Sequence, residues 1–313
     1  MRILFDKPIV FCLALIASGS AGASSVGDLL TEYEDVRAKG VVTHLVDVDN
    51  DTLLLDRDDG FYTSGMRYAH VSSLRTVDRM TSFGWRIGQE LYTASDIKLP
   101  PEFVGPPNHP YAGWLYGGVF REVHHADGTY TKAGVDIGCL GPCAGGEWTQ
   151  TQFHKVINQP LPRGWSKQVR NEAGVVLHGE IAPVRWMFGP SFDVTPAFSA
   201  RFGNIFTDTG ASLLVRAGRL NLLPSAPAFH AYLRAEVRAI GYNATLQGGY
   251  FTKNNPHTVD PKRFTGSAEA GIVLNRGPFG ARLALVRRSN EIRGLPNSTG
   301  AQNYLHLQFS YTP

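Results

Sequence analysis

The feature that most constrains the fold of this chain is a strict alternation of apolar and polar side chains in residues 229–239, within an expected strand over 228–241. From Phe229 to Ala239 every second residue is apolar, and the residues between them are His, Tyr, Arg and Glu. Successive side chains of a β-strand point to opposite faces, so this segment predicts a strand with one apolar and one strongly charged face. The pattern recurs through the C-terminal half, which indicates an all-β fold.

Twelve segments of about ten residues follow this pattern, the length and even number typical of bacterial outer-membrane barrels. They are residues 43–51, 62–74, 83–93, 112–125, 129–139, 172–187, 190–204, 211–220, 228–241, 262–276, 279–291 and 301–311. A closed barrel leaves no sheet edge unpaired in lipid. We therefore expect a 12-stranded antiparallel transmembrane β-barrel. The longer connections, expected outside the cell, are 94–111, 140–171, 221–227, 244–261 and 290–300.

The first 23 residues predict a cleaved signal peptide. Arg2 and Lys7 precede an apolar run, and a small-residue cleavage site ends at Ala23. The run is shorter than the ~20 residues of a membrane-spanning helix. Residues 24–313 would then form one barrel domain in the bacterial outer membrane. The formal net charge of +3 is too small to suggest a nucleic-acid partner.

The longest connection contains a segment without strand alternation, residues 149–159, which predicts a short helix. Thr149 is the expected N-cap and Pro160 the expected stop. Gln150 and His154 are four residues apart and would share one helix face. A neutral histidine can take a proton from water, so His154 is a candidate general base.

Two cysteines stand at the start of the same connection, Cys139 and Cys143. In an oxidising compartment this spacing favours a disulfide that closes a small loop. Metal binding is the less favoured alternative, because the chain has no second cysteine pair.

Polar residues also gather where the first two expected strands meet. Asn50 and Asp51 end one strand, and Thr63 opens the next. The ordinary interpretation is the polar rim of a porin. Ester hydrolysis, however, needs a group that stabilises the oxyanion, and a Ca²⁺ ion held by oxygen atoms can be one.

A second catalytic hypothesis uses His70 and Ser72, which share one face of a strand and could form a Ser-dependent esterase. No Asp or Glu beside them is placed to orient the histidine, so a structural role is favoured. Trp114, after a Pro-Tyr-Ala-Gly run, is expected in an aromatic girdle at the membrane surface.

Taken together, these residues resemble the LpxR-type lipid A 3-O-deacylases. The resemblance covers most of the mature chain, and its pieces occur in the order of the family. They are Asn50–Asp51, Asp56–Arg57, Phe61 to Gly65, Gln89 to Thr93, Pro110 to Trp114, Gly134 to Gly138, Gly141–Pro142, Ala144 to Gly146, Gln150 with His154, Gly164–Trp165, Asn171–Glu172 and Gly203–Asn204.

The resemblance implies a 12-stranded barrel whose active site lies at the extracellular rim, between the wall and a loop helix. It implies Ca²⁺-dependent hydrolysis of the ester that links the 3-O acyloxyacyl chain to lipid A, by a monomer acting on lipopolysaccharide. His154 would activate water, and Asp51, with the region of Thr63, would hold the Ca²⁺ ion.

The resemblance further implies that Asn50 and Gln150 orient groups in the site and that Lys98 contacts a lipid A phosphate. One position departs from the family, since members can carry a Glu where this chain has Pro160. Glu172 and Glu147 are the candidate replacements as metal ligands.

The competing class is a non-enzymatic barrel, either a small porin or a surface protein. Charged residues expected inside the barrel can pair with one another and fill it, which disfavours an open pore. They are Arg234, Glu236, Arg238, Glu269 and Arg282.

Overall fold

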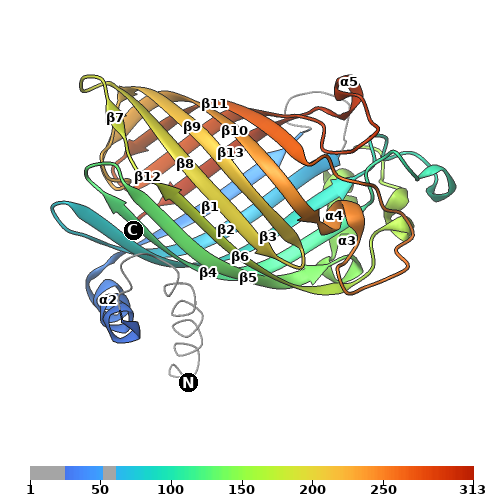
Figure 1. The fold of residues 1–313 in the computed structure, drawn as a ribbon, viewed down its shortest axis with the longest axis horizontal. Helices are drawn as coiled ribbons and strands as arrows, with labels where there is room; N and C mark the ends of the chain where they lie inside the picture. Colours follow the sequence, from blue (N-terminus) through green and yellow to red (C-terminus); the bar gives the residue numbers. More distant parts are fainter. Residues whose placement is uncertain (1–24, 52–60) are drawn as a thin grey trace.

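A computed structural model describes residues 25–51 and 61–313, which form a closed antiparallel β-barrel (Figure 1). The expected signal peptide lies outside these residues. Within them, twelve long strands make the wall: β1 (Val41–Asn50), β2 (Phe61–Arg75), β3 (Arg79–Thr93), β4 (Ala112–His125), β5 (Tyr130–Leu140), β6 (Glu172–Ala182), β8 (Phe192–Gly203), β9 (Phe206–Arg219), β10 (Ala228–Asn243), β11 (Phe264–Arg276), β12 (Phe279–Arg288) and β13 (Gln302–Tyr311). Pairing of β1 with β13 and of β6 with β8 closes the barrel. The expected 12-stranded fold is confirmed.

One expected strand, residues 172–187, is wrong in its extent. β6 ends at Ala182, and a separate two-residue strand, β7 (Trp186–Met187), pairs with β8 only. Pro183 follows β6 directly. Proline has no N–H to donate to a neighbouring strand, which accounts for the break.

The two ends of the barrel differ. The end that we call the loop end carries Asp51 and the connections 94–111, 141–171, 204–205, 244–263 and 289–301. The opposite, turn end carries the C-terminus and the connections 76–78, 126–129, 183–191, 220–227 and 277–278. Residues 221–227 were expected with the long loops, and this was wrong. Connections of an up-and-down barrel alternate between its ends, so strand direction, and not loop length, decides the side.

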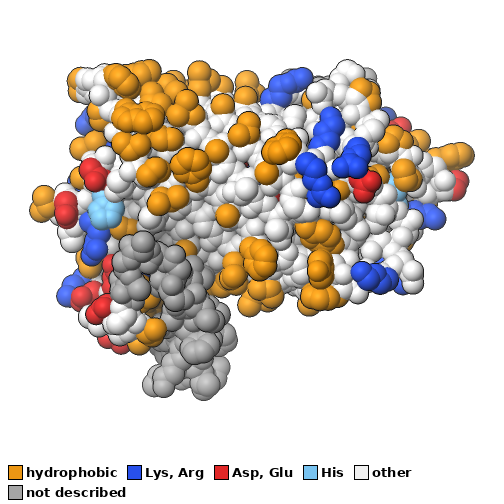
Figure 2. Space-filling view, in the orientation of Figure 1, with side chains coloured by type: hydrophobic (Ala, Val, Ile, Leu, Met, Phe, Trp, Pro, Cys, Tyr) orange, Lys and Arg blue, Asp and Glu red, His pale blue; other side chains and the backbone are white. Residues whose placement is uncertain are grey.

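The outer wall is apolar and the lumen is charged, as the alternation predicts. Phe229, Leu233 and Val237 are each at least 60% exposed on the outside of β10, and apolar side chains spread over the wall (Figure 2). Inside, Glu236 pairs with Arg234 and Arg238.

Further contacts join the inward side chains of strands β9 to β12. Arg238 also contacts Asp208, while Glu269 and Arg282 both contact Tyr232. A cavity of about 370 Å³ remains beside Asp208, Glu236 and Arg238. The expected charge pairing is therefore present for Arg234, Glu236 and Arg238, whereas Glu269 and Arg282 contact Tyr232 and not an opposite charge.

An aromatic layer closes the lumen toward the loop end. Tyr62 contacts the rings of Tyr92 and Tyr304, with ring centroids 5.5 and 5.2 Å apart. Trp114 stacks on Tyr116 and is 2% exposed. The expectation that Trp114 lies in an outer aromatic girdle is therefore wrong.

A helix that the alternation pattern does not predict, α2 (Val26–Lys39), lies near the turn end. Ser25 and Asp28 form a capping box at its start. Val36 packs with Phe83 of β3, and Glu32 accepts two hydrogen bonds from Arg121 of β4. No helix among the described residues is long and apolar enough to cross a membrane.

Candidate active site

The helix α3 (Gly146–Val156) packs against the outside of the wall at the loop end. It follows β5 through the short helix η3 (Pro142–Ala144). A Cβ atom on Gly113 of β4 would lie 3.0 Å from Ala144 Cβ, and one on Gly146 would lie 2.9 Å from Leu91 Cδ2 of β3. These contacts leave no room for larger side chains, so the glycines let the helix approach the wall closely.

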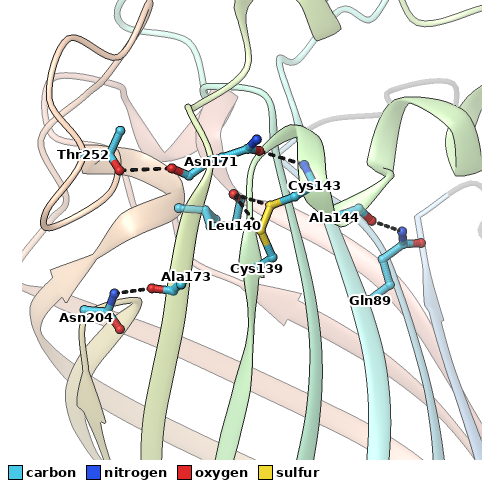
Figure 3. The surroundings of a disulfide bond; sticks show 9 residues. All are labelled: Gln89, Cys139, Leu140, Cys143, Ala144, Asn171, Ala173, Asn204 and Thr252. Atoms are coloured by element: carbon cyan, nitrogen blue, oxygen red, sulfur yellow. Dashed lines mark hydrogen bonds between the residues drawn. A yellow bond between two sulfur atoms is a disulfide. The ribbon is translucent and has the colours of Figure 1, made fainter.

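The start of α3 is tied to the wall at several points (Figure 3). Cys139 and Cys143 form a disulfide, as the sequence favours, between β5 and η3. The backbone N–H of Cys143 donates to Asn171 Oδ1 at 2.8 Å, and Gln89 Nε2 donates to the Ala144 carbonyl at 2.7 Å. The tethers hold the helix over β3 and β4.

The expected helix boundaries are wrong at both ends. The N-cap is Gly145 and not Thr149, because Gly145 has a φ of 69° and separates η3 from α3. Glycine tolerates this left-handed conformation, so the helix can begin directly after it. The helix ends at Val156, before Asn158, whose φ is 56°, and not at Pro160.

Gln150 and His154 lie on one face of α3, as expected, and each is 3% exposed. Trp148 and Val156 on the same helix are exposed, so the polar pair faces the wall. His154 Nδ1 lies 2.7 Å from the Pro160 carbonyl oxygen. A carbonyl only accepts hydrogen bonds, so Nδ1 carries the proton, and Nε2 is the basic atom of the neutral ring.

The side-chain amide of Gln150 is held by Trp165, which is buried in the short helix η4 (Gly164–Lys167). Trp165 Nε1 donates to Gln150 Oε1 at 2.8 Å, and Tyr111 packs edge-on against the indole. The bond fixes the orientation of the amide. Gln150 Nε2 is buried and has no hydrogen-bond partner within residues 25–51 and 61–313.

Asn50 and Thr63 lie on the outer face of neighbouring strands at the same end of the barrel. Asp49 points inward, where it pairs with Arg67, so the next residue, Asn50, points outward. A bulge in β2 places Thr63 beside Thr93, with the two hydroxyl oxygens 2.7 Å apart. Both threonines are buried.

Asp51 directly follows β1 and is 6% exposed, beside the first residues outside the described part of the chain. The described residues contain no cluster of three or more His, Cys, Asp or Glu arranged to hold a metal ion. The oxygen atoms of Asp51, Asn50 and Thr63 are nevertheless of the type that Ca²⁺ binds.

Glu172, the first residue of β6, contacts a different loop. Its carboxylate accepts hydrogen bonds from Asn204 Nδ2 and from the backbone N–H groups of Tyr250, Phe251 and Thr252, at 2.8 to 3.0 Å. The three backbone bonds anchor the connection between β10 and β11, and the bond from Asn204 joins Glu172 to the connection between β8 and β9. The structure gives Glu172 this role, and its role as a metal ligand stays a prediction.

The remaining predicted residues are spread over the loop end and the outer wall. Lys98 is exposed in the connection between β3 and β4, and Glu147 is exposed in the first turn of α3. His70 stacks on Trp85 on the outside of the barrel. In the described chain, neither His70 nor Ser72 has a hydrogen bond to a carboxylate. The esterase hypothesis therefore lacks the group that would orient its base.

Two components of the site were not predicted from the residues alone. The carbonyl of Pro160 binds His154, and Trp165 binds Gln150. Both contacts depend on the path of the chain after α3. The sequence signal for the second contact is the pair Gly164–Trp165, which follows the expected helix and is one of the pieces of the family resemblance.

The chain matches the family model described as outer membrane protein LpxR over residues 9–312. Among solved structures, it is similar to LpxR from Salmonella typhimurium, with a TM-score of 0.72 and 22% identity over 86% of this chain and 99% of that one. Weaker similarities include the β-domain of the Bordetella autotransporter BrkA, with a TM-score of 0.48 and 10% identity over 87% and 98% of the two chains. An outer membrane channel from Pseudomonas putida F1 also has a TM-score of 0.48, with 12% identity over 88% and 96%. No curated protein sequence matches the chain.

Proposed function

Because the chain belongs to the LpxR family of outer membrane proteins, we propose that it is a hydrolase that removes the 3-O-linked acyloxyacyl chain from lipid A. The observation that carries this proposal is the buried His154 on the wall-facing side of α3, with Nδ1 bonded to the Pro160 carbonyl. A histidine held in this tautomer, on the outside of a barrel, is suited to remove a proton from water beside a lipid ester.

In this mechanism, Nε2 of His154 takes a proton from the attacking water. The buried Nε2 of Gln150, which has no partner among the described residues, is a donor available to the ester oxygen. Asn50, Asp51 and Thr63 would hold Ca²⁺. When bound, the ion polarises the ester carbonyl and stabilises negative charge on its oxygen.

The location of the site fits a substrate that stays in the outer leaflet. The site lies on the outer face of the wall and not in the lumen, so lipid A would reach it from the membrane. In this proposal residues 1–23 are removed as a signal peptide, the loop end faces outward, and the mature chain acts as a monomer. Lys98, exposed at the loop end, would contact a lipid A phosphate.

The proposal is tested by replacing the base in a strain that expresses the protein. His154→Ala is expected to abolish removal of the acyloxyacyl chain, seen by mass spectrometry of extracted lipid A. The control is Lys155→Ala, which changes the neighbouring exposed residue and should keep the activity. Heat-modifiable migration on gels shows whether each barrel is folded. A folded His154→Ala barrel that still deacylates lipid A would refute the mechanism.

The non-enzymatic barrel is the second candidate. It predicts that lipid A is unchanged by the wild-type protein as well. Within the described residues, the paired charges and the aromatic layer that fill the lumen argue against a porin.

A further inference from the structure

Basic side chains gather at the loop end of the outer wall, over the ends of β10 and β11 (Figure 2). We use the name outer basic patch for Lys262, Arg263 and Arg287. Arg263 precedes β11, and Arg287 lies near the end of β12. Both are exposed, and Lys262 is half-buried.

Arg287 points outward from the wall. Its neighbours Val286 and Arg288 face the lumen, where Val286 belongs to the inner core and Arg288 lies over the ring of Tyr62. Leu285, on the same outer face as Arg287, is 55% exposed. The guanidinium therefore follows the exposed Leu285 on the outer face of β12, close to the loop end of the wall.

The charges of the patch are bound only to neutral groups in the described residues. Arg287 Nη1 donates to Asn303 Oδ1 at 3.0 Å, and Arg263 Nη1 donates to the Gly241 carbonyl at 2.8 Å. Lys262 Nζ donates to Asn297 Oδ1 at 2.9 Å. Each cation retains N–H groups for a further acceptor.

Acidic residues do not neutralise the patch within the described chain. The backbone carbonyl of Glu291 accepts a hydrogen bond from the backbone N–H of Lys262. The Glu291 carboxylate accepts a hydrogen bond from Gln302 Nε2 at 3.2 Å and lies 3.7 Å from His109 Nε2, so it does not pair with the patch. The backbone carbonyl of Asp260 accepts a hydrogen bond from the backbone N–H of Arg293, and its carboxylate forms no ion pair with the patch among the described residues.

The patch flanks the candidate active site on the side that α3 leaves open. Arg287 pairs with Asn303 of β13, and Leu305 of β13 pairs with Asn50 of β1. With about 4.8 Å between neighbouring strands, β12 lies about 10 Å from β1 along the wall. The helix α3 and Lys98 approach from the other side, over β3 and β4.

We infer that the outer basic patch is a phosphate-binding subsite for the anionic glycolipid that the active site cleaves. This inference rests on the proposed function. Arginine forms paired, charge-assisted hydrogen bonds with phosphate, and three cations with neutral partners favour an anion. The subsite would fix the headgroup on the β1 side of the site while the ester reaches His154.

The test measures hydrolysis of lipid A with its phosphates and of the same lipid A after dephosphorylation. Arg287→Gln is expected to raise KM for the phosphorylated substrate about tenfold, the scale of one charge-assisted hydrogen bond. The kcat for phosphorylated lipid A should not change, and neither should kcat or KM for dephosphorylated lipid A. Arg219→Gln, the same change in an exposed arginine at the turn end, should alter neither substrate.

An equal effect of Arg287→Gln on both substrates, or no effect, would overturn the subsite. If the wild-type protein cleaves neither substrate, the proposed function fails, and native mass spectrometry then tests phosphate binding alone. There, the wild-type barrel should retain more phosphorylated lipid A than Arg287→Gln does, and equal retention would refute binding. If the variant loses bound lipid A but keeps its KM, the patch binds neighbouring lipid molecules and the substrate subsite is refuted.

Discussion

The carboxylate of Glu172 offers a decisive perturbation, because its structural role differs from the one that the sequence predicts. It accepts four hydrogen bonds, three of them from consecutive backbone N–H groups of residues 250–252, and is 5% exposed. In Glu172→Gln, one oxygen becomes an NH₂ group that faces two N–H donors. Two partly buried donors then lose their acceptor, at about 1–2 kcal/mol each, the lower part of the range for a buried group.

We expect the connection around residues 250–252 to be destabilised by about 2–4 kcal/mol, which corresponds to amide exchange about 30 to 1,000 times faster. Hydrogen exchange followed by mass spectrometry measures this for the loop. Ca²⁺ affinity, measured by titration calorimetry, should be unchanged. Glu34→Gln is the matched control, since this exposed carboxylate on α2, near the turn end, should affect neither quantity. Lost Ca²⁺ affinity with unchanged exchange in the loop would show that Glu172 is a metal ligand and that our reasoning is wrong.

Two further predictions concern the loop end. Replacing Cys139 and Cys143 by serine should weaken the attachment of α3 by about 2 kcal/mol, the chain-entropy value for so short a loop; exchange in the first turn of α3 should accelerate, and unchanged exchange would contradict this. Burial lowers the pKa of His109 and of His257 below the usual value. Below about pH 6.5 the folded loops therefore bind fewer protons than the unfolded chain, so loop stability should fall as the pH drops from 7.5 to 5. Hydrogen exchange, corrected for its intrinsic pH dependence, measures the opening free energy of the two loops. An opening free energy that stays the same between pH 7.5 and pH 5 would refute this prediction.

The barrel could be predicted because its strands separate two environments. Alternation in residues 229–239 reports lipid on one side and a charged lumen on the other, and the pairing of Glu236 with Arg238 bears this out. Residues 221–227 were placed at the wrong end because their length was used as the criterion. The helix α2 was not predicted, since its buried residues Leu29 and Val36 face a patch of the wall that only the folded barrel creates.

The candidate site was only partly predictable for a similar reason. The i, i+4 spacing of Gln150 and His154 is local, and the structure confirms that both are buried on one helix face. The groups that orient them, Trp165 and the Pro160 carbonyl, depend on how the chain returns after α3. The anchoring of Glu172 by amides about 80 residues away is likewise a tertiary contact that no local pattern contains.

The most direct test of the proposed function is mass spectrometry of lipid A after incubation with the purified, folded barrel, with added Ca²⁺ and with a chelator. Our account predicts loss of the 3-linked acyloxyacyl group with Ca²⁺, no loss with the chelator, and recovery when Ca²⁺ is restored. An unchanged spectrum in the presence of Ca²⁺, from a barrel shown to be folded, would contradict the assignment as a deacylase. Equal cleavage with the chelator would contradict the role given to Asp51 and the metal.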